Sequence, residues 1–85
     1  MMPKTKKSAV EKDSGIIDVD VDSSDLKHVH YERDAQILQI TFNWGNAAYQ
    51  YRGVPLHEVT DLLGADSIGR AFSMGIRLKY TGVKL

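Results

Sequence analysis

Alternating apolar and polar residues dominate the first half of the folded part of the chain. Residues 17–22 alternate isoleucine or valine with aspartate, and apolar alternation returns in residues 26–32, 35–42 and 47–52. A period of two residues is typical of strands that bury one face. Because the aspartates of residues 17–22 must stay in water, we expect that strand at the edge of a sheet. The pattern predicts an antiparallel β-meander of three or four strands.

Hairpin geometry predicts which strand residues share a face, because opposed residues in an antiparallel pair point the same way. The glycine-containing loop between the last two strands places Ile40 opposite Tyr49. A tight turn at residues 33–34 places Val29 opposite Leu38. The expected core face holds Val29, Tyr31, Leu38, Ile40, Phe42, Ala47, Tyr49 and Tyr51.

Helical spacing replaces alternation in the last third of the chain. We expect Pro55 at the first position of one helix and Gly64 at its end. Asp66 predicts the N-cap of a second, unbroken helix, and residues 78–85 an extended or frayed end. The apolar stripes are Leu56, Val59, Leu62 and Leu63 in the first helix and Ile68, Phe72 and Ile76 in the second. The fold class is therefore α+β, a small antiparallel meander with two C-terminal helices packed on one face.

Charge and composition indicate how the chain divides into a tail and a domain, and which classes of partner it can bind. Residues 1–15 are Lys-rich without apolar periodicity and are expected to be a disordered tail, which leaves residues 16–85 as one α+β domain. The 11 basic and 11 acidic residues cancel, with a balance of −4 over residues 16–34 and +3 over residues 65–85. A polynucleotide binder usually shows a basic surplus. We expect no membrane association and a cytoplasmic location, since the sequence shows neither a signal peptide nor an apolar span and has no cysteine.

A family resemblance rests on a set of short motifs in a fixed order. These are Val21-Asp22-Ser23-Ser24, Val29-x-Tyr31, Leu38-x-Ile40-x-Phe42-x-x-Gly45, Tyr49-x-Tyr51-x-x-Val54-Pro55 and Ala65-x-Ser67-x-Gly69-x-x-Phe72. The chain resembles the KTSC domain, a short module at the C-terminus of some lysyl-tRNA synthetases that also occurs as stand-alone bacterial and phage proteins. The resemblance implies no defined activity. Its tRNA-synthetase context implies RNA binding, and its phage members imply a role against the host.

Catalysis and metal binding have little support in the sequence. There is no Gly-x-Ser-x-Gly elbow or phosphate-binding loop, and nothing orients Ser67 and His57 as nucleophile and base. His28 and His30 share a strand face, which can chelate a metal, but the simpler interpretation is a pair of exposed histidines. We expect a protein that is not an enzyme and has no cofactor.

The second helix offers the best candidate site for an anion. Ser67 and Gly69 lie at its start, where backbone N–H groups are free. Arg70 and Arg77 are seven residues apart and, on a continuous helix, lie on one side with Lys79 beyond them. The alternative is a solvated helix face, with Gly69 present for packing.

Three aromatic residues complete the candidate site. Parity places the Tyr49 and Tyr51 rings in the core, with their hydroxyls at its rim, where they can border a ligand. Trp44 lies in a turn, where it can stack on a base, fold over a helix end or enter a dimer interface.

These features predict a non-catalytic binding module for a nucleotide-like anion. The family context makes one version specific: a homo-oligomeric phage anti-defence protein that sequesters a cyclic nucleotide immune signal in the host cytoplasm. The alternatives are an RNA-binding accessory domain and a protein-interaction adaptor that pairs through a sheet edge.

Overall fold

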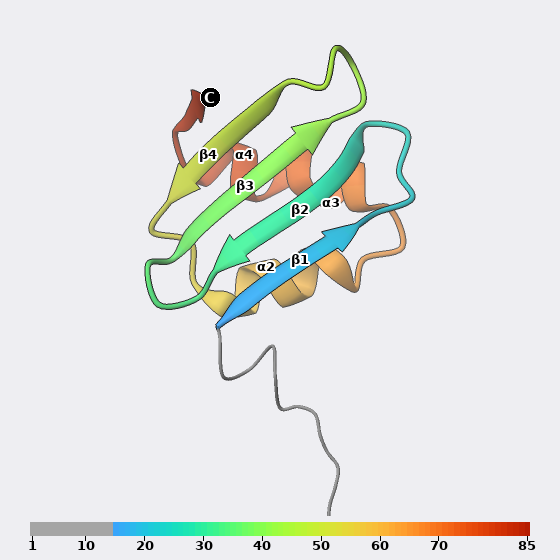
Figure 1. Ribbon diagram of the computed structural model, residues 1–85. Helices are drawn as coiled ribbons and strands as arrows, with labels where there is room; N and C mark the ends of the chain where they lie inside the picture. The colour runs from blue at the N-terminus through green and yellow to red at the C-terminus, as the bar shows by residue number, and fades with distance from the viewer. Residues whose placement is uncertain (1–14) are drawn as a thin grey trace, which may run out of the picture.

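The sheet of the computed structural model has five antiparallel strands, arranged in the order in which they occur along the chain (Figure 1). The structure describes residues 15–85, so the predicted Lys-rich tail lies outside the described residues except for Gly15. The strands are β1 (Ile16–Asp20), β2 (Leu26–Glu32), β3 (Ile37–Phe42), β4 (Ala48–Arg52) and β5 (Gly82–Lys84).

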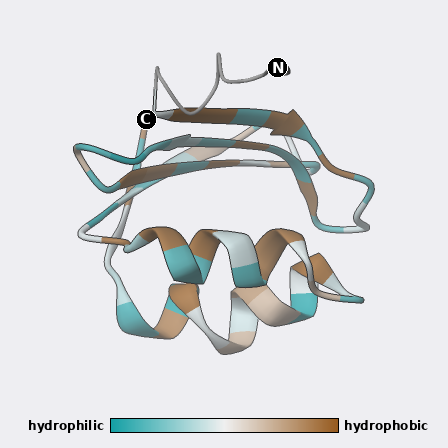
Figure 2. Cartoon of the chain, turned by 90° about the horizontal axis from the view of Figure 1, so that it is seen from below, coloured by the Kyte–Doolittle hydropathy of each residue, from teal (hydrophilic) through white to brown (hydrophobic). Residues whose placement is uncertain are grey.

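Three helical segments form a second layer against one face of this sheet (Figures 1 and 2). They are α2 (Leu56–Leu63), α3 (Ile68–Met74) and α4 (Ile76–Lys79). The predicted α+β class is confirmed, and the helices cover the face that hairpin parity assigned to the core. No helix within residues 15–85 has the length and apolar character needed to cross a membrane.

The register between strands agrees with the prediction at one hairpin and differs at the other. Tyr49 lies opposite Ile40, as expected. Val29 lies opposite Ile40 rather than Leu38, because the β2–β3 loop has four residues, 33–36, instead of two. Gln36 takes a left-handed backbone conformation (φ 55°) that ends this loop. A change of two residues shifts the register but keeps Val29 and Tyr31 on their expected face.

The fifth strand was not expected from the sequence. Residues 82–84 are all exposed, so they carry no alternating pattern that distinguishes a strand from a frayed end. β5 pairs with β4, and Gly82 lies directly opposite Tyr51. A Cβ at Gly82 would meet the Tyr51 ring at 2.7 Å, so glycine lets this ring lie across the strand.

The helix boundaries and burial correct three details of the prediction. Pro55 is the N-cap of α2 rather than its first helical residue, and Leu56 is 38% exposed instead of buried. Ser67, not Asp66, caps α3, because its Oγ accepts the Arg70 N–H at 3.4 Å.

The expected single second helix is interrupted at Gly75. The backbone there (φ −121°, ψ −96°) is not helical and separates α3 from α4. A Cβ at this position would lie 2.9 Å from the Ala71 carbonyl oxygen, so the break favours glycine. The seven-residue spacing of Arg70 and Arg77 therefore does not align them on one continuous helix.

The core lies between the sheet and the helices. It consists of Leu26, Val29, Tyr31, Leu38, Ile40, Phe42, Tyr51, Val54, Val59, Leu62, Phe72 and Ile76. Tyr31 is fully buried, and its hydroxyl donates a hydrogen bond of 2.6 Å to the Val54 carbonyl. This bond ties β2 to the chain just before α2, and burial raises the pKa of the Tyr31 hydroxyl.

The other face of the sheet carries a charged cluster where β1 meets β2. His28 contacts Asp18 at 2.5 Å and Asp20 at 2.6 Å through its two ring nitrogens, and His30 contacts Asp18 at 2.8 Å. The hydrogen bond to Asp20 raises the pKa of His28. The hydrogen bond from His30, followed by that from His28, lowers the pKa of Asp18. The aspartates of this edge strand are thus paired with histidines rather than only solvated.

The Tyr31 hydroxyl provides a test of the core. Replacing Tyr31 with Phe leaves the buried Val54 carbonyl without its donor, and we expect this to lower the free energy of unfolding by about 1–3 kcal/mol. Tyr49→Phe is the matched control, since the Tyr49 hydroxyl makes no hydrogen bond within residues 15–85. Urea denaturation monitored by circular dichroism measures both, and equal effects would contradict this role for Tyr31.

The histidine–aspartate cluster predicts a pH dependence of stability. Because the folded-state pKa of His28 is raised above 6.5, its contribution is complete below pH 6.5 and is lost as pH rises through the raised value. Because the folded-state pKa of Asp18 is lowered below 3.8, its contribution is present above pH 3.8 and is lost as pH falls through the lowered value. The paired cluster is therefore most stabilising between these two limits.

His28→Ala should consequently cost more stability at about pH 5.5 than at about pH 8.5. Thr41→Ala, directly opposite His28 on β3 and without an ionisable side chain, is the control and should show no such difference. Urea titrations at the two pH values give the comparison. A His28→Ala effect that is the same at both would show that the cluster does not act through charge.

Candidate ligand-binding site

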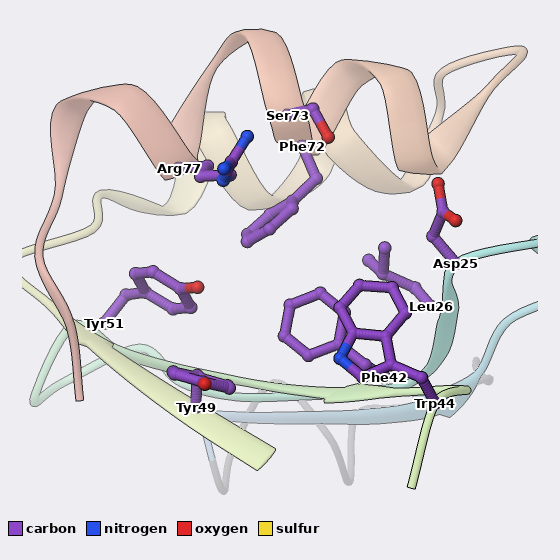
Figure 3. Close-up of a pocket in the computed structure, with 9 residues that line it drawn as sticks. All are labelled: Asp25, Leu26, Phe42, Trp44, Tyr49, Tyr51, Phe72, Ser73 and Arg77. Carbon is purple, nitrogen blue, oxygen red and sulfur yellow. The ribbon is translucent and has the colours of Figure 1, made fainter. Parts of the chain in front are cut away.

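A cavity of about 440 Å³ opens between the helical layer and the end of the sheet near the β3–β4 loop (Figure 3). Its volume lies in the range of small-molecule sites. Four parts of the chain meet here: the turn after β1, the β3–β4 hairpin, α3 and α4. The lining residues are Asp25, Leu26, Phe42, Trp44, Tyr49, Tyr51, Phe72, Ser73 and Arg77.

Aromatic rings form most of the cavity wall. Trp44 stacks on Phe42 with ring centroids 4.5 Å apart and an angle of 17° between the rings. Phe42 also meets Tyr49 and Phe72 edge to face, each at 5.7 Å. Trp44 remains 57% exposed, so one face of the indole is packed while much of the residue is open to solvent. Within this chain Trp44 stacks on Phe42 at the edge of the cavity, and stacking on a base or entry into a dimer interface stay predictions.

Tyr51 places a hydroxyl inside the cavity without a hydrogen-bond partner. The residue is only 5% exposed, and its ring packs edge to face on Phe72 at 5.5 Å. Figure 3 shows the hydroxyl directed into the open space. Burial, and secondarily the neighbouring Tyr49, raises the pKa of Tyr51. A neutral hydroxyl that no residue of the described chain satisfies is available to a ligand.

Arg77 brings positive charge to the same space. The break at Gly75 starts α4 with Ile76 buried, which leaves Arg77 on the side that lines the cavity. Its guanidinium is near enough to Tyr51 to oppose part of the rise in the pKa of that hydroxyl. It makes no ion pair or hydrogen bond within the described residues. A guanidinium in this state can bind an anion through several N–H groups.

Asp25 and Ser73 line the cavity but were not found by sequence reasoning. Asp25 is positioned by its backbone: its N–H donates to Ser23 Oγ at 3.2 Å, and its carbonyl accepts the Asn43 N–H at 2.9 Å. A Cβ at Gly69 would lie 2.8 Å from the Asp25 carboxylate. The glycine of the Ser-x-Gly-x-x-Phe motif therefore marks where α3 packs against this turn, and it was the signal that could have indicated Asp25.

The structure brings together half of the residues that the sequence indicated. Trp44, Tyr49, Tyr51 and Arg77 line the cavity. Ser67 caps α3, Gly69 packs against Asp25, and Arg70 is exposed at the start of α3 away from the lining.

Lys79 is engaged elsewhere. Its Nζ lies 3.2 Å from Glu58, which also accepts a hydrogen bond of 2.5 Å from the Tyr80 hydroxyl. The bond from Tyr80, aided by Lys79, lowers the pKa of Glu58. The predicted clamp of Arg70, Arg77 and Lys79 is thus reduced at the cavity to Arg77.

The metal alternative finds no support in the described part of the chain. Within residues 15–85, no group of three or more histidine, cysteine or acidic side chains is arranged to hold a metal ion. Both ring nitrogens of His28 already face aspartate oxygens.

Comparison with known proteins identifies the fold. The family model of the KTSC domain matches residues 22–80. An uncharacterized protein of Stutzerimonas stutzeri (strain A1501) is 44% identical over 55 residues, which span 65% of this chain and 76% of that protein. The crystal structure of the KTSC domain protein YPO2434 from Yersinia pestis superposes with a TM-score of 0.76 at 31% identity. That match covers 82% of this chain and 97% of the other. The chain therefore belongs to the KTSC domain family.

Proposed function

We propose that the protein is a non-catalytic binding module for a small, nucleotide-like anion held in the aromatic cavity. One observation carries this proposal: the cavity combines the unpartnered Tyr51 hydroxyl with the unpaired Arg77 guanidinium beside it. Neither group has a hydrogen-bond partner within the described residues, so an anionic ligand can accept hydrogen bonds from both.

The aromatic wall supplies the second part of the binding energy. Trp44 is held flat against Phe42, so it presents a rigid indole to a planar base. Stacking of a base on an aromatic side chain contributes about 1–3 kcal/mol. A nucleotide can make both kinds of contact, since its base can stack on Trp44 while its phosphate reaches Arg77.

Size and charge favour a small ligand over a polynucleotide. The formal net charge of the chain is zero, so there is no strong long-range attraction for a phosphate backbone. The cavity is large enough for one ligand of nucleotide size.

Sequestration is the physical consequence of binding a ligand without turning it over. Ser67, the one nucleophile considered in the sequence, accepts the Arg70 N–H as a helix cap and lies outside the cavity lining. A protein that binds a signalling nucleotide without altering it lowers the free concentration of that nucleotide. Capture of a cyclic nucleotide immune signal by a phage protein, with a homo-oligomer closing the site, is the specific version of this proposal.

Arg77→Ala tests the anion end of the cavity. Loss of a charge-assisted hydrogen bond costs about 1.5–3 kcal/mol, so we expect affinity for mononucleotides to fall by about tenfold or more. Arg70→Ala is the matched control, because it removes the same exposed charge from outside the cavity. Isothermal titration calorimetry with nucleoside monophosphates measures both, and circular dichroism confirms that the variants fold. Equal losses in the two variants would contradict this site.

Salt separates this proposal from RNA binding, which the exposed Trp44 and the basic C-terminal quarter of the chain favour as the second candidate. Binding to RNA through several phosphates should weaken steeply between about 50 and 200 mM salt. A mononucleotide in the cavity, with a single phosphate contact, should change far less. Fluorescence titrations with a short single-stranded RNA and with mononucleotides provide the comparison. Tight, salt-sensitive RNA binding without mononucleotide binding would favour the accessory-domain function.

A further inference from the structure

The cavity has two ends of opposite chemical character. Asp25 lies at one end beside Trp44, whereas Arg77 lies near Tyr51 at the other (Figure 3). From this polarity we infer that the ligand is a guanine nucleotide with a single phosphate group, whose base edge meets Asp25 and whose phosphate meets Arg77. This inference rests on the proposed function and adds the class of nucleotide.

The Asp25 carboxylate can accept hydrogen bonds from donor groups of the ligand. It makes no ion pair or side-chain hydrogen bond within residues 15–85, and an ionised carboxylate only accepts hydrogen bonds. Its backbone is held by Ser23 and Asn43, and its side chain is packed against Gly69. The backbone that carries this exposed carboxylate is therefore held in place before a ligand arrives, which reduces the entropy lost on binding.

Guanine is the common base that fits a carboxylate best. Its Watson–Crick edge carries two adjacent donors, N1–H and the N2 amino group, which match the two oxygens of one carboxylate. Adenine and cytosine place a ring-nitrogen acceptor beside their amino group, and uracil flanks its single N–H with two carbonyl oxygens. Each of these edges would set an acceptor against the Asp25 carboxylate, and a site built around an acceptor discriminates against such a ligand.

The single guanidinium limits the number of phosphates. Among the cationic residues described, Arg77 lines the cavity, Lys79 is paired with Glu58, and Arg70 is not part of the lining. One phosphate is matched by Arg77 and by a hydrogen bond from the Tyr51 hydroxyl. Further phosphates would add negative charge to a space that already contains Asp25. GMP and its 3′,5′-cyclic form both satisfy this requirement.

Asp25→Asn tests the base end while preserving the shape of the side chain. An amide presents one donor and one acceptor, which no longer match the two donors of guanine but do match N1–H and O2 of xanthine. Calorimetric titrations with GMP, cyclic GMP, AMP and XMP compare the natural protein with this variant. Asp22→Asn is the matched control, since Asp22 is an exposed aspartate close in sequence that does not line the cavity.

In the natural protein we expect GMP or cyclic GMP to bind about tenfold or more tightly than AMP. Asp25→Asn should weaken guanine-nucleotide binding by about tenfold and make XMP bind more tightly than GMP. AMP should bind more tightly to this variant than to the natural protein, since the N6 donor and N1 acceptor of adenine match the amide. Asp22→Asn should change none of these affinities.

Two negative results would distinguish failure of the guanine inference from failure of the proposed function. If AMP binds as tightly as GMP and Asp25→Asn alters neither, while Arg77→Ala abolishes both, the guanine inference is wrong and the proposed function stands. If no mononucleotide binds the natural protein, the proposed function and this inference both fail.

Discussion

The packing of Phe72 between two rings of the sheet determines how the two layers meet. Phe72 comes from α3 and contacts Phe42 on β3 and Tyr51 on β4, both edge to face. Edge-to-face pairs add about 0.5–1.5 kcal/mol beyond burial, which matters in a domain whose core is small. These contacts also set the height of the helices above the sheet. The cavity lies beside them, with Phe72, Phe42 and Tyr51 as shared walls.

The core and the candidate site share four residues, Leu26, Phe42, Tyr51 and Phe72. Tyr51 is a core residue by burial, yet its hydroxyl faces open space (Figure 3). Two glycines leave room for these side chains. A Cβ at Gly82 would clash with the Tyr51 ring, and a Cβ at Gly69 would clash with the Asp25 carboxylate. A charged group remains available at each end of an aromatic space, and this is the chemistry on which the proposed ligand class depends.

The sequence predicted correctly those features that depend on one residue and its neighbours along the chain. Hairpin parity placed Val29 and Tyr31 on the covered face whether the β2–β3 loop had two residues or four. It placed Tyr49 and Tyr51 there through the β3–β4 pairing. Trp44 and Arg77 were recognised by residue type. Asp25 was not, because its place in the same cavity as Trp44 and Arg77 arises only when segments about 20 and 50 residues away in the sequence fold together with it. The break at Gly75 and the strand β5 depend on one close contact and on pairing with β4, neither of which leaves a periodic pattern.

The central claim is that the aromatic cavity, and not the open face of the sheet, binds a nucleotide. Two-dimensional NMR of the protein titrated with GMP tests it most directly, since the chain has one tryptophan and its indole N–H signal reports on Trp44 alone. The account predicts saturable shifts of the Trp44 indole and Arg77 side-chain signals, with the Gln39 and Gln50 amides of the opposite face unchanged. Shifts confined to the open face would contradict it, as would an unchanged Trp44 signal at saturating nucleotide.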